Sequence, residues 1–120
     1  MGQIDIVRAA YDAWNTGDVT SLREHIHPDV EWHTSGVFPG MQGLYHGHEG
    51  VLQYQKDLAA PFDRFVVTIV EAREEGNVLT VRVHFDAVGA GSGARVELEA
   101  INVWHFRDGL IVRFAPAPVD

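Results

Sequence analysis

The chain has no cysteine among its 120 residues, which excludes disulfide bonds, thiolate nucleophiles and cysteine-based metal sites. Basic residues are also few, because nine Lys and Arg stand against 17 Asp and Glu and the formal net charge is −8. Without a basic stripe to neutralise phosphates, binding to nucleic acid or to an anionic membrane is not expected. No apolar run approaches the ~20 residues of a membrane span. The polar start has no apolar signal segment, so a cytoplasmic protein is expected.

Hydrophobic residues make up 46% of the chain, which is typical of a single globular domain with one core. Apolar periodicity and turn residues predict three helices, at 4–16, from about Thr20 to 26 and at 48–60. A short strand at 30–34 and a glycine-rich loop at 35–47 lie between the second and third helices. The second half of the chain alternates with a period of two and predicts four antiparallel strands, at 65–73, 78–88, 94–106 and 110–116.

Asn102 is the one polar residue on an otherwise apolar strand face. Between Leu98 and Phe106 side chains alternate, so Ala100, Asn102 and Trp104 share a face with these two residues. A lone amide in that setting is either a polar group satisfied inside the core or the polar anchor of a cavity. Both interpretations remain open at this stage.

The opposite face of these strands is largely polar, since Arg82 and His84 alternate with apolar residues and Glu97 and Glu99 follow the same pattern. Ile101 and Val103 interrupt it with apolar side chains. They predict a homodimer that forms through the outer face of the sheet. The alternative is that they are isolated exposed apolar residues, which are common.

Four segments carry a resemblance to a known family: YDAWNTGD (11–18), HPDVEWH (27–33), YHGHEGV (45–51) and INVWHFRDG (101–109). With its order of helices and strands, the chain resembles nuclear transport factor 2-like proteins, and within them the SnoaL-like group. That group includes polyketide cyclases and is related to ketosteroid isomerases. The resemblance covers residues 1–120 as one domain. It implies an α+β fold in which a curved antiparallel or mixed sheet forms a cone around three N-terminal helices, in the order α-α-β-α-β-β-β-β.

The resemblance is less specific for the reaction, because this fold hosts enzymes, binding proteins and assembly modules. The ketosteroid isomerase pattern places its oxyanion-stabilising acid at Asn102, its tyrosine at Ala10 and its general base at Thr34. An amide can donate to an oxyanion, but alanine and threonine cannot replace the other two groups. Steroid isomerisation by that mechanism is therefore not expected.

Epoxide hydrolases of the same fold resemble the chain less. Their arginine–aspartate pair lies on the strand where Val83 and Phe85 are expected to point inward. A register slip of one residue would turn Arg82 and His84 inward instead, and this alternative stays open. Their second aspartate corresponds to a position near Pro116, so an epoxide hydrolase is not expected.

A cone covered by helices would enclose a mostly apolar pocket with few polar groups, which is the usual composition of a small-molecule site. The residues expected to line it are Val7, Trp14, Trp32, Thr34, Tyr54, Val83, Phe85, Asn102, Trp104 and Phe114. Of these, the predicted substrate-binding residues are Trp14, Trp32, Thr34, Tyr54, Val83, Phe85, Trp104 and Phe114. The alternative is that these side chains fill the core and leave no pocket.

Five of the seven histidines lie between positions 25 and 48. The pairs His25-x-His27 and His46-x-His48 have the spacing of metal ligands. Both pairs lie at expected helix ends and turns, where histidine is common, so no metal is expected, and the family resemblance implies that no cofactor is needed.

His33, His46 and His84 are candidate general bases, because imidazole titrates near neutral pH. We favour His46, since the glycine-rich loop that it ends is long enough to lie across the mouth of the cavity. The competing interpretation is that His46 is a surface histidine.

The sequence thus leaves three functional hypotheses. The first is a cofactor-free enzyme that performs acid–base chemistry on a hydrophobic oxo-compound, which the resemblance implies to be of cyclase, isomerase or dehydratase type. Asn102 and His46 are its predicted catalytic residues. The second is a non-catalytic binder of an apolar small molecule. The third is a dimeric protein-interaction module whose cone is packed solid.

Overall fold

The computed structural model describes residues 2–18, 20–34 and 41–118. Its elements are α1 (Gln3–Thr16), the 3₁₀-helix η1 (Thr20–His25), β1 (Ile26–His33), β2 (Leu44–His46), α2 (Gly47–Ala59), β3 (Phe62–Glu75), β4 (Val78–Gly89), β5 (Arg95–Arg107) and β6 (Leu110–Ala117). The strands form one six-stranded sheet in the order β2-β1-β6-β5-β4-β3. Among the described residues, no helix combines the length and apolar character that crossing a membrane requires.

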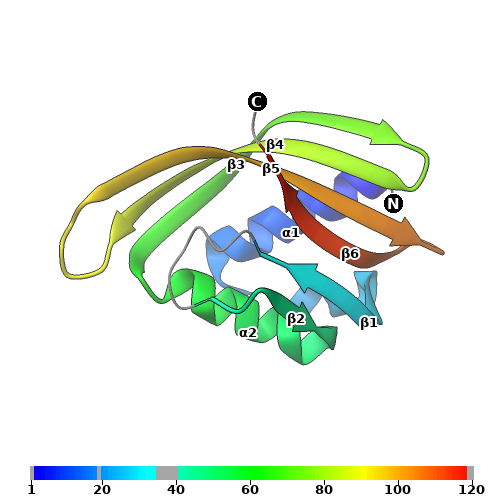
Figure 1. Ribbon diagram of the computed structural model, residues 1–120, viewed down its shortest axis with the longest axis horizontal. Helices are drawn as coiled ribbons and strands as arrows, with labels where there is room; N and C mark the ends of the chain where they lie inside the picture. Colours follow the sequence, from blue (N-terminus) through cyan, green and yellow to red (C-terminus); the bar gives the residue numbers. More distant parts are fainter. Residues whose placement is uncertain (1, 19, 35–40, 119–120) are drawn as a thin grey trace.

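The predicted α+β architecture is confirmed. The long strands β3, β4 and β5 arch over α1, while β1, β2 and α2 lie on the other side of that helix (Figure 1). All neighbouring strands are antiparallel except β1 and β6, which are parallel. The sheet therefore curves around the helices and places its inner face against them.

Helix α1 follows directly from its sequence pattern. Its buried residues are Ile6, Val7, Ala10, Tyr11, Ala13 and Trp14, which form one apolar stripe. Gly17 ends the helix with a φ of 83°, a left-handed conformation that glycine adopts without steric cost, and its N–H bonds to the Trp14 carbonyl at 3.2 Å. The helix is thus the one predicted over 4–16.

The short strands at the N-terminal half differ from the prediction. The strand expected at 30–34 begins at Ile26, and the loop expected over 35–47 ends in β2. Residues 35–40 of that loop lie outside the described residues. Pro28 lies within β1, where the register with β6 shifts between Ile26 and Glu31. These strands exist because Trp32 is paired with Tyr45 on one side and Phe114 on the other, and local periodicity does not reveal such pairing.

Two glycines allow α2 to pack against β1 and β2. Gly47 has a φ of 73°, and a Cβ there would lie 3.2 Å from the Pro28 carbonyl oxygen. A Cβ on Gly50 would lie 3.0 Å from the backbone carbon of Tyr45. The two glycines of the YHGHEGV segment thus allow the backbone of α2 to lie close to the backbones of β1 and β2.

Asn15 joins α1 to the sheet edge formed by β3. Its Oδ1 accepts from the Val67 N–H at 2.8 Å, and its Nδ2 donates to the Val67 carbonyl at 3.0 Å. The side-chain amide therefore satisfies one residue of an edge strand as a neighbouring strand would. This contact fixes α1 beneath the long strands.

An aromatic cluster forms the centre of the core. Trp32 stacks on Phe114 with ring centroids 4.5 Å apart, and it meets Trp104 edge-on at 5.4 Å. Trp14 and Tyr54 reach the same cluster from the helices, with centroids 5.8 and 5.7 Å from that of Trp32. Trp32 and Trp104 are each 0% exposed. These aromatic contacts thus join both α-helices to the inner face of the sheet.

The register of β4 and β5 confirms which side chains face inward. Val81 is paired with Asn102 and Val83 with Ala100, and all four lie on the inner face. Arg82 and His84 lie on the outer face, where they contact Glu99 at 3.4 Å and Glu97 at 3.2 Å. The one-residue slip that an epoxide hydrolase site requires is therefore excluded.

Candidate functional site

A cavity of about 100 Å³ lies between the two α-helices and the inner face of the sheet. The cavity is lined by residues of both α-helices, of the end of β1 and of the four strands β3 to β6. They are Tyr11, Trp14, His33, Thr34, Met41, Tyr54, Leu58, Val67, Val83, Phe85, Leu98, Ala100, Asn102, Phe114 and Pro116. An engineered apolar cavity of about 150 Å³ holds a benzene molecule. The cavity therefore has the scale of a single aromatic ring.

Most residues predicted to line a pocket do surround this cavity, namely Trp14, Thr34, Tyr54, Val83, Phe85, Asn102 and Phe114. Val7, Trp32 and Trp104 do not, and the prediction that they line it needs correction. They are 0% exposed, because neighbouring side chains cover them on every side. Trp32 and Trp104 pack against the lining residues Trp14 and Phe114 on the side away from the cavity, so they are not positioned to touch a ligand.

His46, predicted as the general base, does not reach the cavity. Its neighbour Tyr45 is 3% exposed and points inward, so the alternation of strand side chains turns His46 to the outer face. There it is exposed and paired with Glu31 across the strands. His33, the last residue of β1, is among the lining residues but lies at the exposed rim of the cavity, where its Nε2 is 3.1 Å from the Oε1 of the exposed Glu31.

The polar end of the cavity is built by three side chains. The hydroxyl oxygen of Tyr11 accepts a hydrogen bond from Asn102 Nδ2 at 2.8 Å and one from Trp104 Nε1 at 3.3 Å. Tyr11 and Asn102 line the cavity, and Trp104 lies behind them. The amide on the apolar strand face is therefore both bonded within the core and open to the cavity, so the two interpretations of Asn102 are each partly correct.

Tyr11 was missed by sequence reasoning. The isomerase pattern assigned its tyrosine to Ala10, but the side chain that reaches Asn102 belongs to the next residue. One signal could have identified it. Tyr11 lies on the same apolar stripe as Trp14, and a buried amide opposite such a stripe requires a hydrogen-bonding partner.

The family model of the SnoaL-like domain matches residues 7–114. The chain belongs to the SnoaL-like family. This confirms the resemblance inferred from the sequence, and with it the nuclear transport factor 2-like fold. No curated protein matches this sequence significantly.

Solved structures similar to this SnoaL-like protein share nearly its whole length. A nuclear transport factor 2-like protein of unknown function from Burkholderia pseudomallei has a TM-score of 0.84 at 26% identity, over 95% of this chain and 88% of that one. IdmH, a candidate polyketide cyclase from Streptomyces antibioticus, has a TM-score of 0.78 at 27% identity, over 97% and 91%. TerC, co-crystallised with polyporic acid, has a TM-score of 0.83 at 24% identity, over 95% and 88%, which shows the fold alone.

The cavity of this SnoaL-like protein is nearly uncharged. Burial raises the pKa of the Tyr11 phenol above its usual value, and the bonds from Asn102 and Trp104 offset only part of that effect. Burial likewise raises the pKa of Tyr54. Both phenols therefore keep their protons at neutral pH. Among the described residues of the lining, none is Asp, Glu, Lys or Arg, and His33 is the one imidazole.

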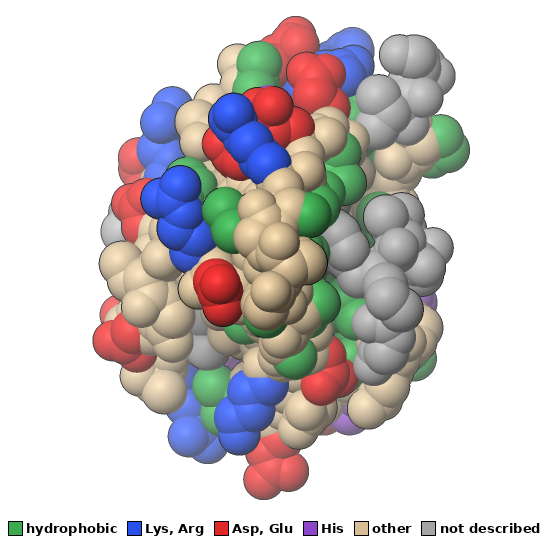
Figure 2. Space-filling view, turned by 90° about the vertical axis from the view of Figure 1, so that its left-hand side faces the viewer, with side chains coloured by type: hydrophobic (Ala, Val, Ile, Leu, Met, Phe, Trp, Pro, Cys, Tyr) green, Lys and Arg blue, Asp and Glu red, His purple; other side chains and the backbone are tan. Residues whose placement is uncertain are grey.

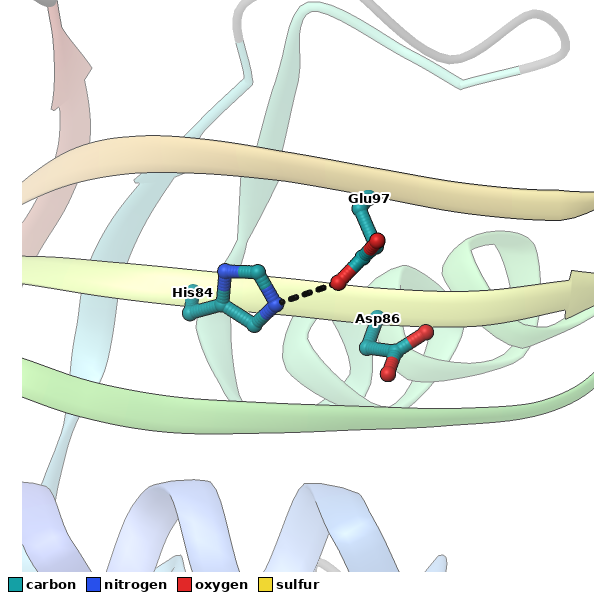
Figure 3. Close-up of side chains that lie close together, drawn as sticks. All are labelled: His84, Asp86 and Glu97. Carbon is teal, nitrogen blue, oxygen red and sulfur yellow. Dashed lines mark hydrogen bonds and ion pairs between the residues drawn. The ribbon is translucent and has the colours of Figure 1, made fainter.

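A second group of ionisable residues lies on the outer face, away from the cavity. His84, Asp86 and Glu97 place their ligand-type atoms within 4.8 Å of one another, and they project from β4 and β5 (Figure 3). Arg95 donates to both carboxylate oxygens of Asp86, at 3.2 and 3.0 Å, and its hydrogen bond lowers the pKa of that carboxyl. The acidic charge is thus paired within the protein, as expected for a cross-strand ion-pair ladder.

Basic and acidic side chains lie side by side at the end of the molecule that carries the β4–β5 hairpin, with hydrophobic ones between them (Figure 2). No basic stripe forms on the face shown there.

The histidines with metal-like spacing make other contacts. His48 Nδ1 accepts from Arg23 at 3.1 Å, and His48 Nε2 lies 2.7 Å from the Ile26 carbonyl. His27 Nδ1 accepts from the Asp29 N–H at 3.0 Å. These contacts give both residues a structural role at the junction of η1, β1 and α2.

Proposed function

We propose that this SnoaL-like protein is a cofactor-free enzyme of cyclase, isomerase or dehydratase type that acts on a hydrophobic oxo-compound. The observation that carries the proposal is the Tyr11–Asn102 pair at the buried end of an otherwise apolar cavity. Because its pKa is raised, the phenol of Tyr11 remains a hydrogen-bond donor at neutral pH. A donor held in a water-poor site stabilises negative charge that develops on a carbonyl oxygen in the transition state.

His33 replaces His46 as the group proposed to move the proton. It lies at the rim of the cavity with its side chain 29% exposed, and the Glu31 carboxylate lies 3.1 Å from its Nε2. If that nitrogen carries the hydrogen, the lone pair lies on Nδ1, which is then able to accept a proton from the substrate. A carboxylate that orients an imidazole in this manner is a common arrangement for general-base catalysis.

Proton exchange at carbon tests the proposal without knowledge of the natural substrate. Small aryl ketones would be incubated with the protein in D₂O, and deuterium at the carbon next to the carbonyl followed by NMR and mass spectrometry. We expect exchange faster than in buffer, and a loss of about 100-fold or more in His33→Ala, the magnitude typical of a removed general base. His46→Ala serves as the matched histidine control and is expected to exchange at the wild-type rate. Equal exchange with wild type, His33→Ala and buffer would contradict the proposal.

A non-catalytic binder is the second candidate, and one observation favours it. Among the described lining residues no carboxylate is present to act as a base. Binding of ketones with no exchange above buffer would support this second function.

We also propose that the protein forms a homodimer through the outer face of the sheet. Ile101 and Val103 lie there, paired with Ala117 and Ala115, and form an apolar band across β5 and β6. Charged residues of both signs border the band in the ladder of β4 and β5, so two copies related by a two-fold axis can pair opposite charges.

The dimer predicts a particle of about twice the 13.3 kDa chain mass in light scattering at micromolar concentration. Val103→Glu places a charge in the centre of the apolar band and is expected to yield a monomer with an unchanged circular dichroism spectrum. Glu99→Gln, at the border of the band, is the control and should remain dimeric. A wild-type particle of about 13 kDa at that concentration would refute the proposal.

A further inference from the structure

At the polar end of the cavity, some hydrogen-bonding groups of Tyr11 and Asn102 have partners and others do not. The Tyr11 oxygen receives two donors, one from Asn102 and one from Trp104. A hydroxyl oxygen has room for about two incoming hydrogen bonds. The phenol therefore has no capacity left to accept a hydrogen bond from a ligand, and among the described residues no acceptor is recorded for its own hydrogen.

The two polar atoms of the Asn102 amide also differ in whether they have a partner. Its Nδ2 is bonded to Tyr11, whereas within the described part of the chain its Oδ1 has no donor. Asn102 is 9% exposed and lines the cavity. One donor, the phenol hydrogen, and one acceptor, the amide oxygen, are thus left next to each other at the end of an apolar space.

We infer that the ligand of this site carries a carbonyl oxygen with an N–H or O–H donor on a neighbouring position, as a primary amide, a lactam or an α-hydroxy ketone does. The carbonyl accepts from Tyr11, and the neighbouring donor bonds to the Asn102 oxygen. This inference rests on the proposed function, because it names the class of oxo-compound that the same cavity selects.

Energetics favour such a ligand over a simple ketone. A buried polar group left without a partner costs about 1 to 3 kcal/mol. A ligand with only an acceptor leaves the Asn102 oxygen unpaired, so a site of this kind discriminates against it more strongly than an apolar wall does. Because burial raises the pKa of Tyr11, the phenol hydrogen is present throughout the neutral range.

Trp104 is the positioning residue of this arrangement. It is 0% exposed and touches no ligand, but its N–H occupies the second acceptor site of the Tyr11 oxygen. The phenol is thereby limited to donating.

Three one-ring probes of nearly equal shape test the inference. Ethylbenzene has no polar group, acetophenone has an acceptor alone, and benzamide replaces the methyl group of acetophenone by an N–H donor. Dissociation constants would be measured by NMR titration, and the ratio of the acetophenone constant to the benzamide constant compared between wild type and Asn102→Leu. We expect this ratio to be about 2- to 12-fold larger in wild type, which corresponds to one hydrogen bond of about 0.5 to 1.5 kcal/mol.

Because acetophenone and benzamide are hydrated to the same extent with either protein, their difference in hydration cancels when the ratio is compared between wild type and variant. Val83→Ala is the control, because it changes the shape of the cavity without touching its polar end, and it should retain the wild-type ratio. If Asn102→Leu does not fold, Asn102→Ser is expected to lower the ratio in the same direction.

Two results would overturn the inference while leaving the proposed function intact. One is an equal ratio in wild type and both Asn102 variants. The other is a ratio that is smaller in wild type, which indicates an amide turned with its NH₂ group toward the ligand. A different result separates the two proposals: if none of the probes binds, including ethylbenzene, the cavity admits no ligand and the proposed function fails together with the inference.

Discussion

Trp32→Ala is expected to lower the free energy of unfolding by about 3 to 5 kcal/mol, the range observed when a fully buried tryptophan or phenylalanine is truncated. Trp32 is 0% exposed and contacts Trp14, Tyr54, Trp104 and Phe114, so its removal leaves a void that surrounding side chains can fill only in part. A domain of this size has a total stability of about 5 to 15 kcal/mol, so the variant loses a large share of it. Urea unfolding followed by circular dichroism measures the effect.

Trp32→Phe is the matched control for this substitution. It keeps an aromatic ring against Phe114 and should cost clearly less than the alanine variant, because less volume is lost. A loss below about 1 kcal/mol in Trp32→Ala would contradict the central position of Trp32 in the core, since a fully buried aromatic side chain contributes more than that.

Tyr11→Phe is expected to lower the free energy of unfolding by about 2 to 4 kcal/mol, although the ring and its packing are retained. The variant removes the one atom to which both Asn102 Nδ2 and Trp104 Nε1 donate. Each buried donor then lacks a partner, and each such group costs about 1 to 3 kcal/mol. Thermal and urea unfolding of the two proteins provide the comparison.

A double variant distinguishes this cause from a simple loss of packing. Asn102→Leu removes one of the two unpartnered donors, so Tyr11→Phe combined with Asn102→Leu should be less destabilised than the sum of the single variants. The coupling energy is expected to be about 1 kcal/mol or more, as for residues in direct hydrogen-bond contact. Additive effects would show that the Tyr11–Asn102 hydrogen bond contributes little to stability.

Much of the fold was accessible from the sequence because the relevant signals are local. The alternation of apolar and polar residues in β4 and β5 predicted that Val83, Phe85 and Asn102 face inward, and the observed pairing of these strands agrees. Helix α1 and its end at Gly17 followed from a 3.6-residue stripe and a single glycine. In each case neighbours along the chain decide the structure, and the period of the element can be read directly.

The incorrect predictions concern features that depend on residues far apart in the sequence. Strand β2 has only three residues, and it is a strand because β1 pairs with it. That pairing turns Tyr45 inward and His46 outward, and so removes the predicted general base from the cavity. Trp32 and Trp104 look like pocket residues by type, but whether an aromatic side chain faces a void or fills it depends on every neighbour at once.

The sequence by itself determined the family, the order of the longer elements and the inward face that holds Asn102, because hydrophobic period and turn residues act over a few positions. Only the tertiary structure decided that Tyr11 meets Asn102, that His46 points away and that an open space remains beside them. Those outcomes depend on contacts between segments up to 91 residues apart, such as the bond from Asn102 to Tyr11, and on how completely side chains from different elements fill the volume between them.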